Sequence, residues 1–171
     1  MLKIFVNTWG NYNVNGADGG EWIELPMDED ELEAKLAMIA SNMGDEDPEF
    51  AIHDYEWTSK VDFGKVGEMD SITDWNELCN EADAIDEDEL EGMAAAIGAF
   101  GYSFREALDR CQRGCFTFYP GQTLTEVAEM IVDECYDLPE FAMRYFDYEA
   151  FARDLGIDGY METDYGVICD N

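Results

Sequence analysis

The strongest constraint on this chain is an excess of negative charge that its few basic residues cannot neutralise. The sequence contains 41 Asp and Glu residues against 9 Lys and Arg, a formal net charge of −32 over 171 residues. Charges of one sign repel each other, and a compact globule of this length has a radius of gyration of only about 15 Å. We therefore expect small subdomains in an elongated molecule, because elongation separates the like charges.

Hydrophobic content distinguishes the chain from a disordered acidic tail. Hydrophobic residues make up 47% of the sequence and aromatic residues 13%, which is enough to build packed cores. No apolar run approaches the ~20 residues that a membrane-spanning helix needs, and the first residues are typical of a strand rather than a signal peptide. The sequence predicts a soluble, cytoplasmic protein that binds neither membranes nor nucleic acid, since both are anionic.

Residues 1–62 predict an N-terminal α+β domain in which one helix packs on a three-stranded antiparallel sheet. Alternating apolar residues favour strands at 2–8, 21–25 and 49–57, the first two joined by a loop rich in Asn and Gly. Between the second and third strands, Asp28 stands at the N-cap of an amphipathic helix. Gly44 is the expected end of that helix.

Residues 63–103 predict an acidic helical domain. Ser71, Asp86 and Ser103 each occupy an N-cap position, with an acidic residue three positions later and apolar residues at helical spacing beyond it. Eleven carboxylates and no basic residue lie in positions 66–104. A charge run usually marks a solvated face, but so many carboxylates without counter-charge indicate a surface for a basic partner.

Residues 104–171 predict a C-terminal α+β domain. An aromatic-rich strand at 115–119 is followed by a helix capped by Thr123, and the chain ends in a hairpin at 159–170. The predicted fold class is therefore α+β, built as an antiparallel three-stranded sheet with a helix, an acidic helical bundle, and a second antiparallel sheet with helices.

The segment FDYEAFARDL, residues 146–155, has the pattern of an amphipathic helix. Asp147 is placed to accept backbone N–H bonds at its first turn, and Gly156 is expected to end it in the left-handed conformation. Tyr148, Phe151, Ala152 and Leu155 share one face at the spacing of a buried stripe. The pattern indicates a helix that packs in a core and carries no catalytic group.

That segment, followed by Gly-Ile-Asp-Gly-Tyr, closely resembles the C-terminal signature of the ArdA antirestriction family. The opening strand and loop of residues 4–25, and the stretch DPEFAIHDYE of residues 47–56, resemble the same family. The likeness spans the chain and is weakest at residues 61–119, where only composition and spacing agree.

The resemblance implies a function as well as a fold. ArdA proteins are acidic mimics of B-form DNA from mobile genetic elements, and they occupy the DNA-binding groove of type I restriction-modification enzymes. The resemblance therefore implies an antirestriction protein that inhibits these enzymes without chemistry. It also implies a homodimer joined through the C-terminal domain.

In this interpretation, carboxylates stand where the phosphates of DNA would lie. The candidate DNA-mimic surface consists of Asp28, Glu29, Asp30, Glu33, Asp45, Glu46, Asp47, Asp54, Glu77, Glu81, Asp83, Glu87, Asp88, Glu91, Glu126, Glu129, Asp133 and Glu134. The candidate dimer interface consists of Phe116, Phe118, Tyr119, Tyr145 and Tyr148. The residues of the second set would serve equally well inside the core of a monomer.

The sequence contains no pattern that predicts catalysis, a metal or a cofactor. The single histidine, His53, has no nucleophile pattern around it and is expected to be structural. The five cysteines lack zinc-site spacing and are expected to be reduced. A calcium-loop alignment beginning at Asp45 fails, because its sixth position, which requires Gly, is Phe50.

Charge alone leaves a second function open. An acidic binding module for a different DNA-binding protein, or a weak binder of divalent cations, would have the same composition. Only the family resemblance favours the DNA mimic. The one basic cluster, Arg105, Arg110 and Arg113, is expected to form local ion pairs or to pair across a dimer interface.

Overall fold

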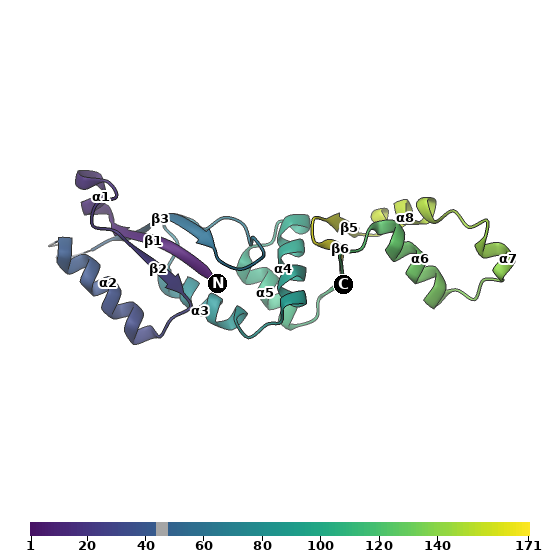
Figure 1. Cartoon of the computed structure of the whole chain (residues 1–171), viewed down its shortest axis with the longest axis horizontal. Helices are drawn as coiled ribbons and strands as arrows, with labels where there is room; N and C mark the ends of the chain where they lie inside the picture. The colour runs from purple at the N-terminus through teal and green to yellow at the C-terminus, as the bar shows by residue number, and fades with distance from the viewer. Residues whose placement is uncertain (44–47) are drawn as a thin grey trace. The chain divides into compact units, whose positions relative to one another are not determined.

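The computed structural model describes residues 1–43 and 48–171, which form helices and small antiparallel sheets (Figure 1). The chain divides into two compact units, an N-terminal unit (Met1–Ile85) and a C-terminal unit (Asp86–Asn171). Each unit has its own three-stranded antiparallel sheet, so the predicted α+β class is confirmed. The division into three domains at residues 62 and 103 stays a prediction.

The sheet of the N-terminal unit is built on β1 (Leu2–Thr8). This strand pairs antiparallel with β2 (Glu21–Leu25) on one side and with β3 (Phe50–Trp57) on the other. The register places Ile4 opposite Ile23 of β2, and both side chains are buried. The predicted strands are confirmed because their alternation of apolar residues matches the period of a half-buried strand.

A short helix, α1 (Trp9–Asn15), lies in the connection that the sequence predicted to be an irregular loop. The Thr8 hydroxyl caps it by accepting a bond from the Asn11 backbone N–H at 3.2 Å. The buried Asn11 amide donates to the Asn7 side-chain oxygen at 3.0 Å, and the Asn7 amide donates to the Gly16 carbonyl at 3.2 Å. Asn and Gly favour turns, so the helix depends on this amide network rather than on helix propensity.

Helix α2 (Glu29–Met43) begins where the sequence predicted and contacts β1. The Asp28 carboxylate accepts a bond from the Asp30 backbone N–H at 3.0 Å, and three acidic residues in the first turn complement the positive end of the helix dipole. Leu32 and Ile39 are buried. The predicted stop at Gly44 lies outside the described residues.

Helix α3 (Ile72–Ala82) is capped by Ser71, as predicted. It is joined to the end of β2 by the buried amide of Asn76. That amide accepts a bond from the Met27 backbone N–H at 2.8 Å and donates to the Met27 carbonyl at 2.9 Å. Both bonding groups of the buried amide are therefore satisfied, and the helix is held at a fixed position against the sheet.

The sheet of the C-terminal unit consists of β4 (Phe116–Pro120), β6 (Gly166–Asp170) and β5 (Tyr160–Thr163), in that spatial order and all antiparallel. Phe118 pairs with Ile168 in the register of β4 and β6. The final hairpin and the aromatic strand that the sequence predicted are both confirmed.

Helices cover both sides of this sheet (Figure 1). On one side α4 (Glu87–Phe100) packs on the strands, and α5 (Phe104–Gln112) packs on α4. On the other side α6 (Leu124–Cys135) and α8 (Tyr148–Ile157) pack on each other and on β5. The short helix α7 (Glu140–Met143) lies between α6 and α8 in the chain. The sheet therefore has two apolar clusters, one on each side.

The predicted N-caps Asp86, Ser103, Thr123 and Asp147 all accept backbone N–H bonds in the structure. The predicted end of the last helix at Gly156 is wrong, because the helix continues through Ile157. A glycine three residues later, Gly159, has the positive φ of +103°. Gly156 and Gly159 both lie near the end of this helix, and residue preferences alone do not show which of them follows the last helical turn.

Loss of the cap at Thr123 gives a direct test of the α6 helix start. The Thr123 hydroxyl accepts from the Glu126 backbone N–H at 3.3 Å, and the Glu126 carboxylate accepts from both the Thr123 backbone and its hydroxyl at 2.8 Å. Thr123→Ala is expected to lower the free energy of unfolding by about 1 kcal/mol. Urea unfolding measures this, with Thr125→Ala in the same helix as the control. Equal losses in the two variants would contradict it.

Candidate partner-binding surface

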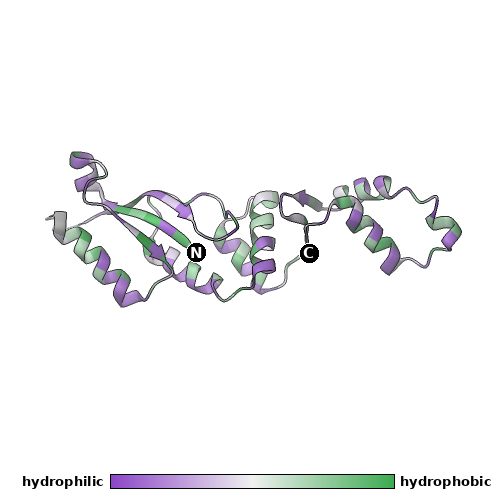
Figure 2. Ribbon diagram, in the orientation of Figure 1, coloured by the Kyte–Doolittle hydropathy of each residue, from purple (hydrophilic) through white to green (hydrophobic). Residues whose placement is uncertain are grey.

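The carboxylates of the candidate DNA-mimic surface point to solvent wherever the structure describes them. All of these are exposed except Glu91, which is half-buried. Asp45, Glu46 and Asp47 lie outside the described residues. Hydrophilic and hydrophobic residues alternate along α2 and α6 (Figure 2), so each helix turns its acids away from the core it covers.

In the N-terminal unit, acids of the surface lie on α2, α3 and β3. Asp28, Glu29 and Asp30 cluster where α2 begins, and Glu33 lies one turn beyond Glu29. The remaining four described acids of the surface in this unit are Asp54 on β3, Glu77 and Glu81 on α3, and Asp83 directly after α3. Residues four apart on a helix lie side by side, so Glu77 and Glu81 form a pair of adjacent negative charges.

In the C-terminal unit, the surface acids lie on α4 and α6. Glu126, Glu129 and Asp133 share one face of α6 at helical spacing. Bonds donated by the Thr123 backbone and hydroxyl lower the pKa of Glu126 below its usual value. The charged form of this carboxylate therefore contributes stability above its unfolded pKa, and that contribution is lost as the pH falls through the folded pKa.

Two basic residues pair with acids outside the candidate surface. Lys35 lies 3.9 Å from Glu31 on α2, and Arg113 lies 3.9 Å from Asp109 on α5. Exposed pairs of this kind contribute little to stability. Because 9 basic residues stand against 41 acidic ones, most of the negative charge has no basic residue to neutralise it.

Arg110 belongs to a tighter arrangement that joins α5 to the last strand. Its guanidinium donates to Asp170 at 2.6 Å and lies 4.5 Å from the ring centre of Tyr102. The Tyr102 hydroxyl donates to the other Asp170 oxygen at 2.6 Å, and this bond is the main reason that the pKa of Tyr102 is raised. The local pairing expected of the basic cluster is present for Arg113, whereas Arg110 pairs within the chain with an acid of the last strand.

The melting temperature of the protein is expected to rise with sodium chloride. Screening shortens the Debye length from ~10 Å at 0.1 M to ~3 Å at 1 M, and repulsion among 41 acidic residues outweighs the pairs that 9 basic residues can form. Thermal unfolding followed by circular dichroism at low and high sodium chloride measures the effect. A melting temperature that falls with salt would contradict the importance of self-repulsion.

The residues of the candidate dimer interface are divided between the core and the surface. Phe116 and Phe118 are half-buried and pack against the apolar cluster beneath α4. Tyr119 lies 6.4 Å from Tyr160, between ring centres. Tyr145, in contrast, is 77% exposed. Some residues of the predicted interface therefore pack within one chain, while Tyr145 remains exposed.

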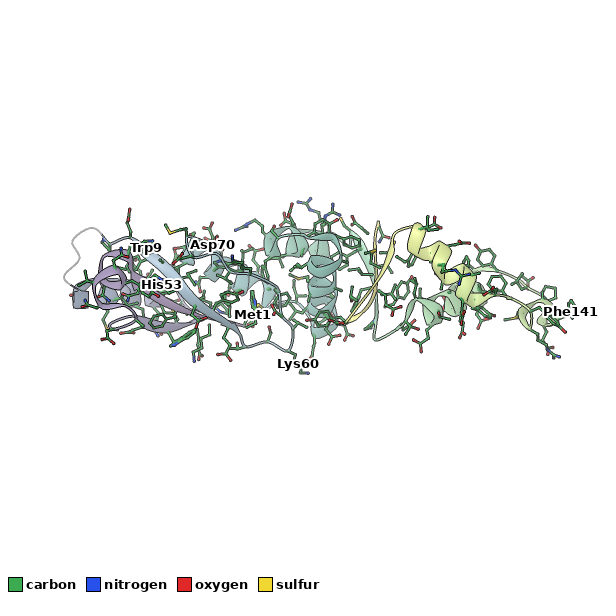
Figure 3. The ribbon with its side chains drawn as sticks, turned by 90° about the horizontal axis from the view of Figure 1, so that it is seen from above. Met1, Trp9, His53, Lys60, Asp70 and Phe141 are labelled. Carbon is green, nitrogen blue, oxygen red and sulfur yellow. The ribbon has the colours of Figure 1, made fainter. Side chains whose placement is uncertain are left out.

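Exposed aromatic residues gather around α7, and of these the sequence analysis identified Tyr145 but not Phe141. Phe141 is 74% exposed and lies 5.4 Å from Tyr145, between ring centres. Figure 3 shows Phe141 at the end of the C-terminal unit farthest from its sheet. Tyr136, at the end of α6, is also exposed, whereas the exposed Ile157 lies at the other end of α8, close to β5 in the chain. One feature of the sequence could have indicated this group. Pro139 separates α6 from α7, and a helix as short as α7 cannot bury an apolar face.

His53 is a packed aromatic group of the N-terminal unit. Its side chain is 4% exposed, and its ring stacks on Tyr12 with ring centres 3.7 Å apart. Trp9 contacts the same ring edge-on at 5.4 Å, and both side chains are labelled beside each other in Figure 3. Its Nδ1 lies 3.4 Å from a Glu68 carboxylate oxygen. These contacts are those of a core residue.

Three grooves in the described part of the chain combine apolar and acidic lining residues. One, of about 340 Å³, lies between α4 and the β5–β6 hairpin, where Glu162 and Asp164 accompany Ala95, Ala99 and Met161. In the N-terminal unit, a groove of about 360 Å³ runs beside α2, where Glu29 and Glu33 flank Leu32, Leu36 and Phe50. In the C-terminal unit, the α4–β4 groove has a volume of about 310 Å³. Its lining includes Asp88, Glu89, Gly92, Cys111, Phe116 and Phe118.

Within residues 1–43 and 48–171, no group of three or more His, Cys, Asp or Glu side chains is arranged to hold a metal ion. The helices in that part of the chain are all too short or too polar to cross a membrane. The features of the described surface that could bind a partner are therefore exposed carboxylates, three grooves and an aromatic group.

Comparison with known proteins gives a family match. The sequence profile of the family described as "Antirestriction protein (ArdA)" matches residues 4–169, which is nearly the whole chain. No match was found among curated proteins.

Proposed function

Because the chain belongs to the ArdA family of antirestriction proteins, we propose that it inhibits type I restriction-modification enzymes as an acidic mimic of B-form DNA. Its carboxylates take the place of phosphates in the basic DNA-binding groove of the enzyme. Inhibition then requires occupancy and no chemistry, and it takes place in the cytoplasm. Antirestriction is the function of the family, whereas the mimicry and the choice of enzyme are the parts proposed here.

The observation that carries this proposal is the exposure of the predicted surface carboxylates on both units. B-DNA presents one phosphate charge per ~1.7 Å of axis, so 41 carboxylates correspond to the charge of roughly 70 Å of duplex. A protein that binds DNA through phosphate contacts has basic residues at matching intervals. The same basic residues would attract the exposed acids of this chain.

We also propose that the protein acts as a homodimer, joined through the C-terminal unit. The exposed Phe141, Tyr145 and Tyr136 supply apolar surface of the kind that interfaces bury. A two-fold pair would match the two-part target sites of type I enzymes. Light scattering after gel filtration tests this: twice the chain mass at micromolar concentration supports the dimer, and a single chain mass contradicts it.

A cleavage assay tests the inhibition. Unmodified DNA with a type I target site is incubated with the type I enzyme and increasing amounts of the protein, at fixed ionic strength. Cleavage is expected to stop near one inhibitor per binding site. A type II enzyme acting on the same DNA is the control and should be unaffected. Equal loss of both activities would indicate nonspecific polyanion inhibition, and undiminished type I cleavage would contradict the proposal.

A further inference from the structure

We propose that the α4–β4 groove binds an arginine side chain of the basic protein partner. This inference rests on the proposed function, because it takes the partner to be a DNA-binding surface rich in basic residues. The groove would be a specific contact site. The other carboxylates of the surface attract the partner collectively, through long-range electrostatic attraction.

The groove is formed where the first turns of α4 lie over β4. Gly92 makes this close approach possible, because a Cβ on that residue would lie 3.3 Å from atoms of both Phe116 and Phe118. The two rings are half-buried, since one part packs on the core cluster and the rest lines the groove. The floor is therefore aromatic and partly open to solvent.

The rim of the groove is acidic. Asp88 and Glu89 lie in the first turn of α4, are exposed, and belong to the groove lining. The half-buried Cys111 lines the groove from α5. Burial is the main cause that raises the pKa of its thiol to about 11, and the negative charges of Glu89 and Asp86 add to that effect. The negative charge of Glu89 on the rim therefore acts on a residue that lines the groove.

This combination selects the class of side chain that binds. A phosphate or carboxylate would meet two negative charges, and an aliphatic side chain would cover the carboxylates without pairing them. A guanidinium can stack on the face of an aromatic ring and donate paired hydrogen bonds to carboxylates. Its three-carbon stem matches the apolar floor. Arginine therefore fits better than lysine, whose ammonium lacks the planar fork.

Titration with N-acetyl-arginine methylamide tests the groove without any enzyme. Amide shifts of the ¹⁵N-labelled full chain are followed by NMR at constant ionic strength, with sodium chloride as the ionic control. The expected result is that shifts concentrate at Gly92, Cys111, Phe116 and Phe118. Shifts of similar size on every acidic helix would overturn the proposal, because they would show only diffuse attraction.

Paired variants separate the groove from the rest of the surface. Asp88→Asn with Glu89→Gln removes the rim charges, and Glu129→Gln with Glu134→Gln removes the same charge from exposed positions on α6. The first pair is expected to weaken arginine binding about tenfold, and the second at most about twofold. Equal effects of the two pairs would overturn the proposal. Circular dichroism checks that both variants are folded.

The same two variants are then compared as inhibitors of type I cleavage. The rim pair is expected to need about ten times more protein for half inhibition than the wild type, and the α6 pair about twice as much. If the wild type does not inhibit cleavage at all, the proposed function fails, while the NMR titration still decides the groove. If the wild type inhibits and both pairs act alike, the groove is not the anchor.

Discussion

Neutralising the acidic run of α3 and α4 together is expected to reduce affinity for the type I enzyme by at least about a hundredfold at low salt, because several phosphate-like contacts are lost at once. The variant changes six carboxylates to amides. These are Glu77, Glu81, Asp83, Glu87, Asp88 and Glu91. Each of these carboxylates takes the place of one phosphate contact among many. The slope of log affinity against log salt concentration should therefore also become shallower.

Single substitutions give the matched control. Asp88→Asn or Glu129→Gln alone is expected to change affinity less than about threefold, because each removes one charge of a distributed set. Equilibrium titration at several salt concentrations measures both series. The variant with all six substitutions should also unfold at a higher temperature than the wild type, since repulsion among its acidic residues is reduced. A single substitution that abolished binding in a folded protein would contradict a distributed surface.

Replacement of Ile4 by alanine is expected to have the largest effect on stability, a loss of about 3 kcal/mol in the free energy of unfolding. Ile4 is fully buried in the central strand of its sheet, opposite Ile23 of β2 and Tyr55 of β3. The substitution removes buried apolar area and leaves a cavity between these neighbours. Urea unfolding followed by circular dichroism measures the loss.

The control for this substitution is Val14→Ala. Val14 is 80% exposed on α1, so its truncation should change the free energy of unfolding by less than about 0.5 kcal/mol. Similar losses in the two variants would show that Ile4 does not occupy the packed centre of the N-terminal unit.

Local rules predicted most of the secondary structure. Ser71, Asp86, Ser103 and Thr123 each begin a helix as expected, because an N-cap depends on residues within one turn. The helix α1 was missed for the converse reason. It depends on amide bonds from residues outside the helix, among them the Asn7 side chain, and helix propensity gives no sign of those.

The exposure of the acids was predictable, whereas their individual importance was not. Helical spacing places acidic residues opposite the apolar stripe, so the solvent-facing position of Glu129 follows from the sequence. Asp88 and Glu89 have the same local pattern. What distinguishes them is the approach of α4 to Phe116 and Phe118, and that contact joins residues far apart in the chain.

Competition with DNA tests the central claim most directly. A fluorescent duplex that contains the target site is bound to the type I enzyme, and the protein is added while the fluorescence anisotropy is followed. The account predicts complete displacement of the duplex, at protein concentrations that rise steeply with salt. A complex that holds enzyme, duplex and protein together while cleavage is inhibited would contradict occupation of the DNA-binding groove.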